Sequence, residues 1–263
     1  MARSVFYYHR ARLDEPDGYE GLRDRITEAY EKNHRRYGYR RICYALKEDG
    51  VKVNHKTVLK LMQQMGLKAK CKKRHYHSYK GNVGKIAPNV IGRDFAADRP
   101  NMKWATDVTQ VCINDEKTYI SPILDMFNGE IISYTISRSP NLKMVTDMLR
   151  QAFRKHPHLA GLVMHSDQGW HYQHGSYQRL LDGRDIIQSM SRKGNCLDNS
   201  MMENFFALMK NEMLYTVKYD SVEDFEQELR KYIWWYNNKR IKLRLKGMSP
   251  AQYRAHYYRE LNN

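Results

Sequence analysis

Three successive segments rich in valine, isoleucine, threonine and tyrosine follow Pro100, and they constrain the fold more than any other part of the chain. Branched and aromatic side chains are typical of β-strands. Asn128-Gly129, between the second and third segments, is a strong signal for a two-residue hairpin turn. We therefore predict three antiparallel strands, at residues 104–113, 119–127 and 130–137.

Helical and strand-like patterns alternate in the rest of the chain. Met144, Val145, Met148, Leu149 and Ala152 recur at helical spacing and mark one buried face. Antiparallel strands followed by alternating helices and strands predict an α/β fold with a sheet of mixed direction. The elements predicted after the first three strands are a helix at 142–155, a strand at 162–164, a helix at 177–181, a strand at 186–189, and two final helices at 198–214 and 221–238.

The first 66 residues have a different sequence pattern, in which short helical segments are separated by turns. Asn54 is a predicted N-cap for the third of these helices, which Gly66 ends. Two helices joined by a short turn, with basic residues at the helix starts, are typical of a helix-turn-helix DNA reader. The alternative is a small helical bundle that is merely basic, because helix-turn-helix patterns give many false matches.

Basic residues outnumber acidic ones by 45 to 29 among the 263 residues, and the net charge of +16 favours a polyanionic partner such as nucleic acid. The excess is uneven, since residues 1–97 hold 22 basic and 10 acidic side chains while residues 98–263 hold 23 and 19. Residues 66–93 contain eight lysines and arginines and no acid, which indicates a linker. Such a run is either a solvated charged segment or one that follows DNA phosphates.

Several classes of protein do not fit the sequence. The first residues lack the apolar core of a secretory signal, and no stretch approaches the ~18 apolar residues of a membrane span. The four cysteines stand alone, with no CxxC pair for zinc or redox chemistry. We therefore expect free thiols and no structural disulfide, as is usual in a reducing cytosol.

Three acids lie where the predicted elements would carry them to one edge of the sheet. Asp107 is within the first strand, Asp167 follows the strand at 162–164, and Glu203 is on the helix at 198–214. Three carboxylates without histidine or cysteine ligands suit Mg²⁺ or Mn²⁺, and a pair of such ions ~4 Å apart supports phosphodiester chemistry. Each acid could instead be a structural ion-pair or capping residue. Asp125 is an equally good candidate on spacing alone.

Short motifs stand in a characteristic order along the chain. They are YGYRRI at 37–42, VNHKTV at 53–58, WATDVT at 104–109, HSDQG at 165–169, NCLDNSMMEN at 195–204, YNNKR at 236–240 and MSP at 248–250. This order resembles the second-frame, OrfB-type transposases of bacterial insertion sequences, whose catalytic core is similar to retroviral integrase. The first two motifs resemble the family's helix-turn-helix segment, the next three its catalytic blocks, and the last two its C-terminal signature. The 35 residues between Asp167 and Glu203 match the spacing of the DD(35)E group.

The resemblance implies a ribonuclease H-like fold and a DNA transposase that is a metal-dependent polynucleotidyl transferase. Such an enzyme nicks insertion-sequence ends to free 3′-hydroxyl groups and joins them to DNA. The family pattern selects Asp107, Asp167 and Glu203 over Asp125 as catalytic residues. It also makes these three acids the ligands of two Mg²⁺ ions, for which Mn²⁺ would substitute.

Further residues are predicted to act around the three acids. Lys210 matches the basic position that the family places next to DNA. His165 and Asn199 are candidates for orienting the acids. Trp170 is either a stacking surface for a DNA base or a packing residue, and we favour packing. The other predicted DNA contacts are Arg40, Arg41, Lys56, Lys72, Lys73, Arg74, Lys239 and Arg240, the last two within a basic cluster that extends to Lys242, Arg244 and Lys246.

The predicted domains are a helix-turn-helix-like DNA-binding region at 1–75, a basic linker at 76–97, a catalytic core at 98–215, and a C-terminal helix with a basic tail at 216–263. The expected partners are double-stranded DNA, further copies of the chain on DNA, and the upstream-frame OrfA protein or a fusion with it. No membrane partner is expected, and the expected location is the bacterial cytoplasm at the nucleoid. Two rival functions are a nuclease of the same fold that only hydrolyses DNA and a non-catalytic DNA-binding regulator of transposition.

Overall fold

The computed structural model describes residues 18–69 and 85–262, together with Arg3 and Tyr7. The chain divides into two compact units, Met1–Lys70 and Cys71–Asn263. The predicted DNA contacts Lys72, Lys73 and Arg74 lie outside the described residues.

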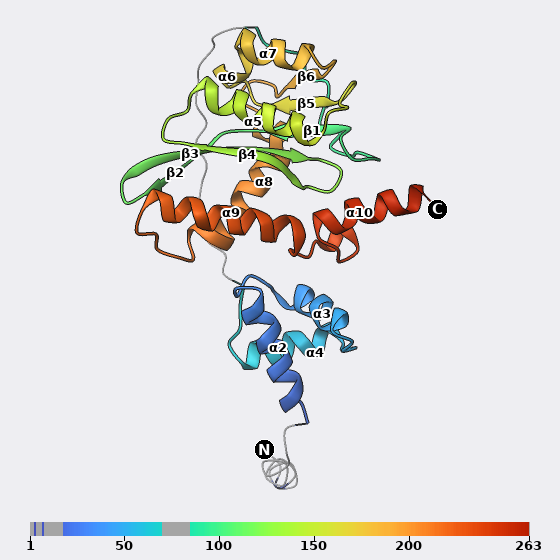
Figure 1. The fold of residues 1–263 in the computed structure, drawn as a ribbon. Helices are drawn as coiled ribbons and strands as arrows, with labels where there is room; N and C mark the ends of the chain where they lie inside the picture. Colours follow the sequence, from blue (N-terminus) through green and yellow to red (C-terminus); the bar gives the residue numbers. More distant parts are fainter. Residues whose placement is uncertain (1–2, 4–6, 8–17, 70–84, 263) are drawn as a thin grey trace. The chain divides into compact units, whose positions relative to one another are not determined.

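The first unit contains three described helices, α2 (Glu20–Lys32), α3 (Tyr39–Glu48) and α4 (His55–Gln64) (Figure 1). The predicted N-cap is confirmed, because the Asn54 side chain accepts a hydrogen bond from the backbone N–H of Lys56 at 2.8 Å. Buried apolar side chains from all three helices form the core of this unit. They are Ile26, Ala29, Tyr30, Ile42, Leu46, Val58, Leu61 and Met62.

The second unit is built on one sheet of mixed direction, as predicted. β2, β3 and β4 form an antiparallel meander, while β1 pairs antiparallel with β3 and parallel with β5, which is parallel to β6. The order across the sheet is β2-β3-β1-β5-β6, with β4 also paired to β3. The strands are β1 (Lys103–Thr106), β2 (Thr109–Ile113), β3 (Glu116–Asp125), β4 (Ile131–Ser137), β5 (Val163–Ser166) and β6 (Ile187–Met190).

The predicted strand at 104–113 is two strands in the structure. β1 ends at Thr106 and β2 begins at Thr109, and different parts of the long strand β3 pair with each. Asp107 therefore stands directly after β1 and not in the middle of a strand.

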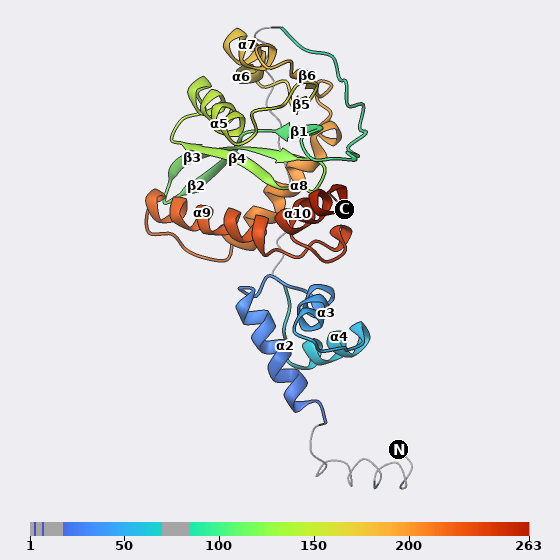
Figure 2. The ribbon, with the colours of Figure 1, turned by 45° about the vertical axis from the view of Figure 1, so that its right-hand side comes forward.

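Helices cover both faces of the sheet (Figures 1 and 2). α5 packs on β3 and β4 and contacts α7, and a core that includes Trp104, Val145, Met164 and Tyr172 fills this side. α8 contacts β1 and α9 contacts β4 on the other side. The helices of this unit are α5 (Leu142–Lys155), α6 (Trp170–Gln173), α7 (Gly175–Asp182), α8 (Ser200–Met209), α9 (Val222–Asn238) and α10 (Pro250–Leu261).

The helix predicted at 198–214 has three parts. A 3₁₀ turn, η1 (Cys196–Asn199), leads into α8, and a π-helical turn, η2 (Lys210–Leu214), follows it. A second 3₁₀ turn, η3 (Leu243–Leu245), precedes α10. The prediction missed α6 and α10, although the capping box of Ser249 and Gln252 marks the start of α10.

The C-terminal segment, residues 216–263, forms hydrogen bonds with the turn between β3 and β4. The side-chain amide of Asn237 donates to and accepts from the backbone of Ile131, both at 2.9 Å. The Lys242 ammonium donates to the carbonyl of Gly129 at 3.1 Å. This segment is therefore an integral part of the second unit.

Residues 85–97 are the described part of the predicted linker, and they pack against the rest of the second unit. The backbone N–H of Val90 donates to Ser189 Oγ at 3.0 Å, and Arg93 pairs with Asp198 at 2.8 Å. Within residues 18–69 and 85–262 no helix is long and apolar enough to cross a membrane. Cys43 and Cys112 are free thiols, as expected.

Candidate active site

Asp107 and Asp167 leave the sheet side by side. β1 and β5 are parallel neighbours, with Ala105 opposite His165. Asp107 directly follows β1, and Asp167 directly follows β5. Because neighbouring parallel strands end at the same edge of a sheet, both carboxylates emerge at the carboxyl ends of two central strands, where α/β sheets bind ligands.

Burial raises the pKa of both carboxyl groups, and neighbouring acids also act on Asp107. Burial raises the pKa of Asp107 well above its usual value, and the nearby carboxylates of Asp167 and Glu203 raise it further. Burial likewise raises the pKa of Asp167. Val108 N donates to Asp107 Oδ1 at 2.7 Å, and Gly169 N donates to Asp167 Oδ1 at 2.9 Å, so a backbone N–H holds each group. The result is a concentration of acidic groups whose ionised forms a cation would stabilise.

Glu203 reaches the same region from the helix layer. It lies in the first turn of α8, and partial burial raises its pKa. Just before α8, Asn199 Nδ2 donates to the carbonyl of Thr106 at 3.3 Å, which ties the start of the helix to the end of β1. In the part of the chain that the structure describes, no group of three or more His, Cys, Asp or Glu side chains is arranged to hold a metal ion. Asp107 is nevertheless close enough to Asp167 and Glu203 for both acids to raise its pKa.

Lys210 supplies positive charge at this edge of the sheet. It begins η2, directly after α8, and its ammonium donates to Thr109 Oγ1 at 2.8 Å. The same ammonium lies close enough to Asp107 to lower the pKa of that carboxyl, against the effect of burial. The structure thus places Lys210 beside the first of the three predicted acids.

Family models match most of the chain. An HTH-like domain matches residues 19–75, and two integrase core domain models match residues 97–196 and 203–257. The InsK protein of insertion sequence element IS150 from Escherichia coli (strain K12) is 48% identical over 259 residues, which cover 98% of this chain and 91% of InsK. The transposase for insertion sequence element IS904 from Lactococcus lactis subsp. lactis is 34% identical over 236 residues, which cover 89% of this chain and 93% of that protein.

The chain belongs to the OrfB-type transposases of bacterial insertion sequences. Its fold class, a ribonuclease H-like mixed sheet preceded by a helix-turn-helix-like region, is the one that the sequence predicted. The HTLV-2 integrase catalytic core aligns with this chain with a TM-score of 0.47 at 18% identity, over 60% of this chain and 98% of that one. The transposase is an enzyme of the DDE transposase/integrase class, and enzymes with an integrase core generally use a divalent metal ion.

Asp125 has a structural role in the transposase. Its side chain is fully buried, and Oδ2 accepts from Arg254 Nη2 at 2.8 Å and from the backbone N–H of Asn101 at 2.9 Å. Its other oxygen, Oδ1, accepts from the backbone N–H of Phe127 at 3.0 Å. These contacts join β3 to α10, so the alternative candidate from the sequence is a core ion pair.

His165 links the strand that carries Asp167 to the segment that leads into α8. It is fully buried, and Nε2 donates to the carbonyl of Asp198 at 2.9 Å, because a carbonyl can only accept. Nδ1 then accepts from Ser189 Oγ at 2.9 Å, and burial lowers the pKa of the ring. His165 thus joins β5 to the hydroxyl of Ser189 and to the backbone of Asp198, just before α8.

Asp198 is a residue that the sequence did not single out. Its side chain is 0% exposed and takes hydrogen bonds from Arg192, Arg93 and Asn89, at 2.8–3.1 Å. These interactions hold the pKa of Asp198 far below its usual range, with Arg192 the largest cause. The sequence offered one weak signal for this role, an aspartate followed by an asparagine at the start of a predicted helix. The partners of Asp198 are residues 89, 93 and 192, and no local pattern links them to it.

The loop after Asp167 is tightly packed beneath its carboxylate. A Cβ on Gly169 would meet Asp167 Oδ1 at 2.9 Å and the Tyr172 ring at 3.3 Å, so a larger residue here would displace the Asp167 carboxylate. Burial, with the carboxylates of Asp107 and Asp167, raises the pKa of Tyr172 well above its usual value. Trp170 is 41% exposed, and its ring packs against His171 with ring centroids 4.0 Å apart.

Arg240 corrects the predicted set of DNA contacts. It is 2% exposed, and its guanidinium donates to both oxygens of Glu212, at 2.8 and 2.6 Å. A side chain enclosed in this way is not placed to reach a phosphate. Its neighbour Lys239 is exposed.

The remaining predicted DNA contacts that the structure describes lie in the helix-turn-helix-like unit. Arg40 is exposed at the start of α3, and Arg41 is half-buried with its guanidinium 5.7 Å from the centre of the Tyr37 ring. Lys56 is exposed in the first turn of α4. These residues stay predicted DNA contacts.

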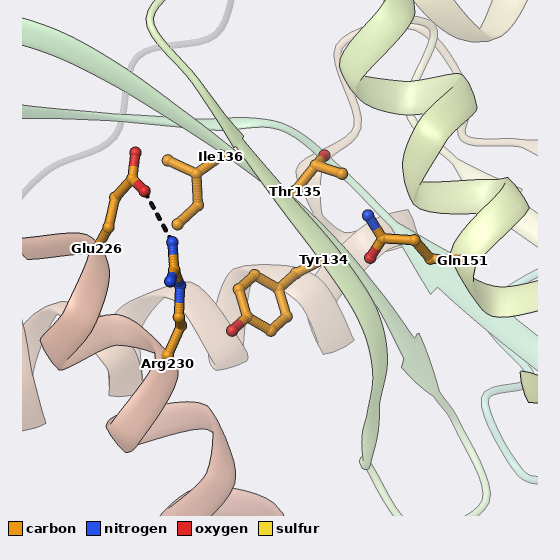
Figure 3. Close-up of a pocket in the computed structure, with 6 residues that line it drawn as sticks. All are labelled: Tyr134, Thr135, Ile136, Gln151, Glu226 and Arg230. Carbon is orange, nitrogen blue, oxygen red and sulfur yellow. Dashed lines mark hydrogen bonds and ion pairs between the residues drawn. The ribbon is translucent and has the colours of Figure 1, made fainter. Parts of the chain in front are cut away.

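A separate pocket lies away from the acids, along β4 (Figure 3). Tyr134 and Thr135 of β4 line it, Gln151 of α5 lies on one side, and the ion pair of Glu226 and Arg230 from α9 lies on the other. None of the predicted site residues lines this pocket.

Proposed function

We propose that Asp107, Asp167 and Glu203 form the catalytic centre of the transposase. The observation that carries this proposal is the emergence of Asp107 and Asp167 from neighbouring parallel strands, with pKa values raised by burial and, for Asp107, by the nearby acids. Perturbed carboxyl groups that share one site are typical of catalytic centres. The Asp125 carboxylate already accepts hydrogen bonds from Arg254 and two backbone N–H groups, so it is not available to bind a metal ion.

The donor set suits two Mg²⁺ ions, for which Mn²⁺ substitutes, because every side chain offers only carboxylate oxygens. Asp107 and Asp167 would hold both ions, and Glu203 would hold one of them. When bound, the ions would supply positive charge to the attacking and leaving oxygens of a phosphodiester.

The proposed reaction nicks an element end and then joins the freed strand to DNA. In the joining step the 3′-hydroxyl oxygen forms a bond to a phosphorus of the target, and the bond from that phosphorus to the target 3′-oxygen breaks. The displaced oxygen takes up a proton and becomes a new 3′-hydroxyl. Lys210 would hold a phosphate beside Asp107, and Asn199 and His165 would keep the acid-bearing segments in place.

The helix-turn-helix-like unit would provide much of the affinity for duplex DNA through Arg40, Arg41 and Lys56, with Lys239 as a further contact on the second unit. Two DNA ends must meet during insertion, so we propose that copies of the chain assemble on DNA. We also propose that the upstream-frame OrfA protein, alone or as a fusion, assists. We further propose that the enzyme acts in the bacterial cytoplasm at the nucleoid, where its DNA substrate lies.

Labelled element-end DNA, intact or already cut to expose the 3′-hydroxyl, tests the proposed reaction in the presence of Mg²⁺. The transposase should nick the intact DNA and join the precut DNA to a target duplex. Nicking without joining would indicate the rival nuclease. Tight binding without either product, also in the presence of OrfA, would indicate a non-catalytic regulator.

A further inference from the structure

The π-helical turn η2 stands between the proposed catalytic helix and the C-terminal segment. Lys210 is its first residue, and the backbone N–H of Tyr215 donates to the Lys210 carbonyl at 2.9 Å, five residues back. A π turn inserts an extra residue into a helix and occurs often at functional sites. It persists only where its surroundings enforce it.

Glu212, in the middle of this turn, contacts residues of the C-terminal segment. Its carboxylate is 7% exposed and accepts both Nε and Nη2 of Arg240, at 2.8 and 2.6 Å. The Tyr232 hydroxyl donates a further hydrogen bond to Oε2 at 3.0 Å. Arg240 follows α9, and its own guanidinium lies 5.4 Å from the centre of the Tyr236 ring. The turn is therefore anchored by residues 20 to 28 positions further along the chain.

A buried bidentate ion pair fixes the backbone of both partners more strictly than a surface pair does. Arginine and carboxylate match in two parallel hydrogen bonds, so small rotations of η2 would break one of them. Removal of either partner leaves the other charge buried without compensation. The pair therefore restrains the backbone of η2 at Glu212.

Lys210 is the first residue of the same turn. Its ammonium donates to Thr109 Oγ1 at 2.8 Å and lies beside Asp107. It lies two positions before Glu212, which carries the anchored carboxylate. A rotation of the turn that lost the anchor would carry the Lys210 side chain away from Thr109.

We propose that Glu212 and Arg240 are positioning residues that set the π turn and thereby hold Lys210 against the Asp107 side of the catalytic centre. The proposal rests on the proposed function of that centre. It gives the C-terminal segment a role in strand joining that does not depend on DNA contact by Arg240. A displacement of only about 1 Å at a positioned group can lower a rate about 100-fold.

The first arm of the test measures the position of Lys210 and needs no activity. Full-length wild-type, Glu212→Gln and Arg240→Lys proteins are treated with an amine-acylating reagent, and the rate at Lys210 relative to the exposed Lys231 is measured by mass spectrometry. Arg240→Lys keeps the charge but loses the planar fork, so it is the milder change. The relative rate at Lys210 should rise about threefold to tenfold, the factor for the loss of one hydrogen bond.

Arg254→Gln is the matched control. Arg254 is also a C-terminal arginine paired with a buried acid, Asp125 at 2.8 Å, but it lies on α10 and contacts the turn after β3. It should lower the melting temperature without changing the relative acylation of Lys210. An unchanged rate at Lys210 in folded Arg240→Lys, or an equal rise in Arg254→Gln, would overturn the proposal.

The second arm is a double-mutant cycle on strand joining. Arg240→Lys should lower the joining rate of the wild-type protein about tenfold or more, yet have little further effect in a Lys210→Ala background, because residues that act through one another are not additive. Fully additive losses would overturn the positioning role. If the wild-type protein joins no DNA at all, the proposed function fails, while the acylation arm still decides whether the pair positions Lys210.

Discussion

Asp107 and Asp125 lie close in sequence, but the structure predicts opposite consequences when each is changed to asparagine. Asp125 is buried and accepts hydrogen bonds from Arg254 and from the backbone N–H groups of Asn101 and Phe127. An asparagine has one acceptor oxygen and places an NH₂ group against at least one of these donors. One unsatisfied buried donor and a weakened ion pair together cost about 3 kcal/mol.

In a unit of this size each kcal/mol corresponds to ~2–4 °C of melting temperature, so Asp125→Asn should melt about 6–12 °C lower than wild type. Asp107→Asn should melt at the wild-type temperature or above it in metal-free buffer. Burial raises the pKa of both carboxyl groups, but the Arg254 guanidinium lowers that of Asp125, whereas the neighbouring acids Asp167 and Glu203 raise that of Asp107 further, so the amide at Asp107 removes a repulsion.

Scanning calorimetry at neutral pH with EDTA measures both effects, and strand joining in Mg²⁺ below the lower melting temperature completes the comparison. Asp125→Asn should join DNA at a rate near that of wild type, whereas Asp107→Asn should not join it measurably. The reasoning is refuted if Asp107→Asn melts several degrees below wild type, or if folded Asp125→Asn has lost joining.

Three further predictions concern single residues around the site. Lys210→Ala should impair joining and end binding about tenfold or more, as expected for a lost charge-assisted contact, with a small change in melting temperature because its partner Thr109 is a neutral hydroxyl and not a paired acid; a large drop in melting temperature with normal joining would show a structural role. Gly169→Ala should lower joining because the added Cβ meets the Asp167 carboxylate at 2.9 Å, and equal rates for the variant and wild type in single-turnover assays would contradict this contact. The lowered pKa of Asp198 means that its contribution to stability is present above its unfolded pKa of ~3.9 and is lost as the pH falls through the folded value; Asp198→Asn should therefore melt lower at neutral pH and show a shallower decline in acid, and parallel stability curves for both proteins would exclude that role.

The sequence predicted the sheet because strand patterns are local. The branched residues on either side of Asn128-Gly129 predicted the meander, but the predicted two-residue turn is wrong, because residues 126–129 form the connection between the hydrogen-bonded residues Asp125 and Glu130, and Gly129 has a positive φ while Asn128 does not. The break at Asp107 was not visible, since Val108 and Thr109 continue the same pattern of residue types. Pairing of β3 with both β1 and β2 decides this break, and pairing partners are not encoded locally.

Ion pairs between distant residues explain the remaining errors. Arg240 belongs to a run of basic residues that is typical of a DNA-binding surface. Its burial follows from Glu212, 28 residues earlier, and no local pattern links the two. The π turn at Lys210–Leu214 is equally hidden, because a search at 3.6 residues per turn extends α8 straight through it. The helix α10, in contrast, had a readable start at Ser249-Pro250, with Gln252 completing the capping box.

The most direct test is to locate bound metal in crystals of the transposase grown with precut element-end DNA and Mn²⁺, by anomalous diffraction at the manganese edge. We expect anomalous peaks in contact with the carboxylates of Asp107 and Asp167, with Glu203 in contact with one of the peaks, and no peak at Asp125. Manganese bound elsewhere, or DNA seated at the site without metal between Asp107 and Asp167, would contradict the assignment of the catalytic centre.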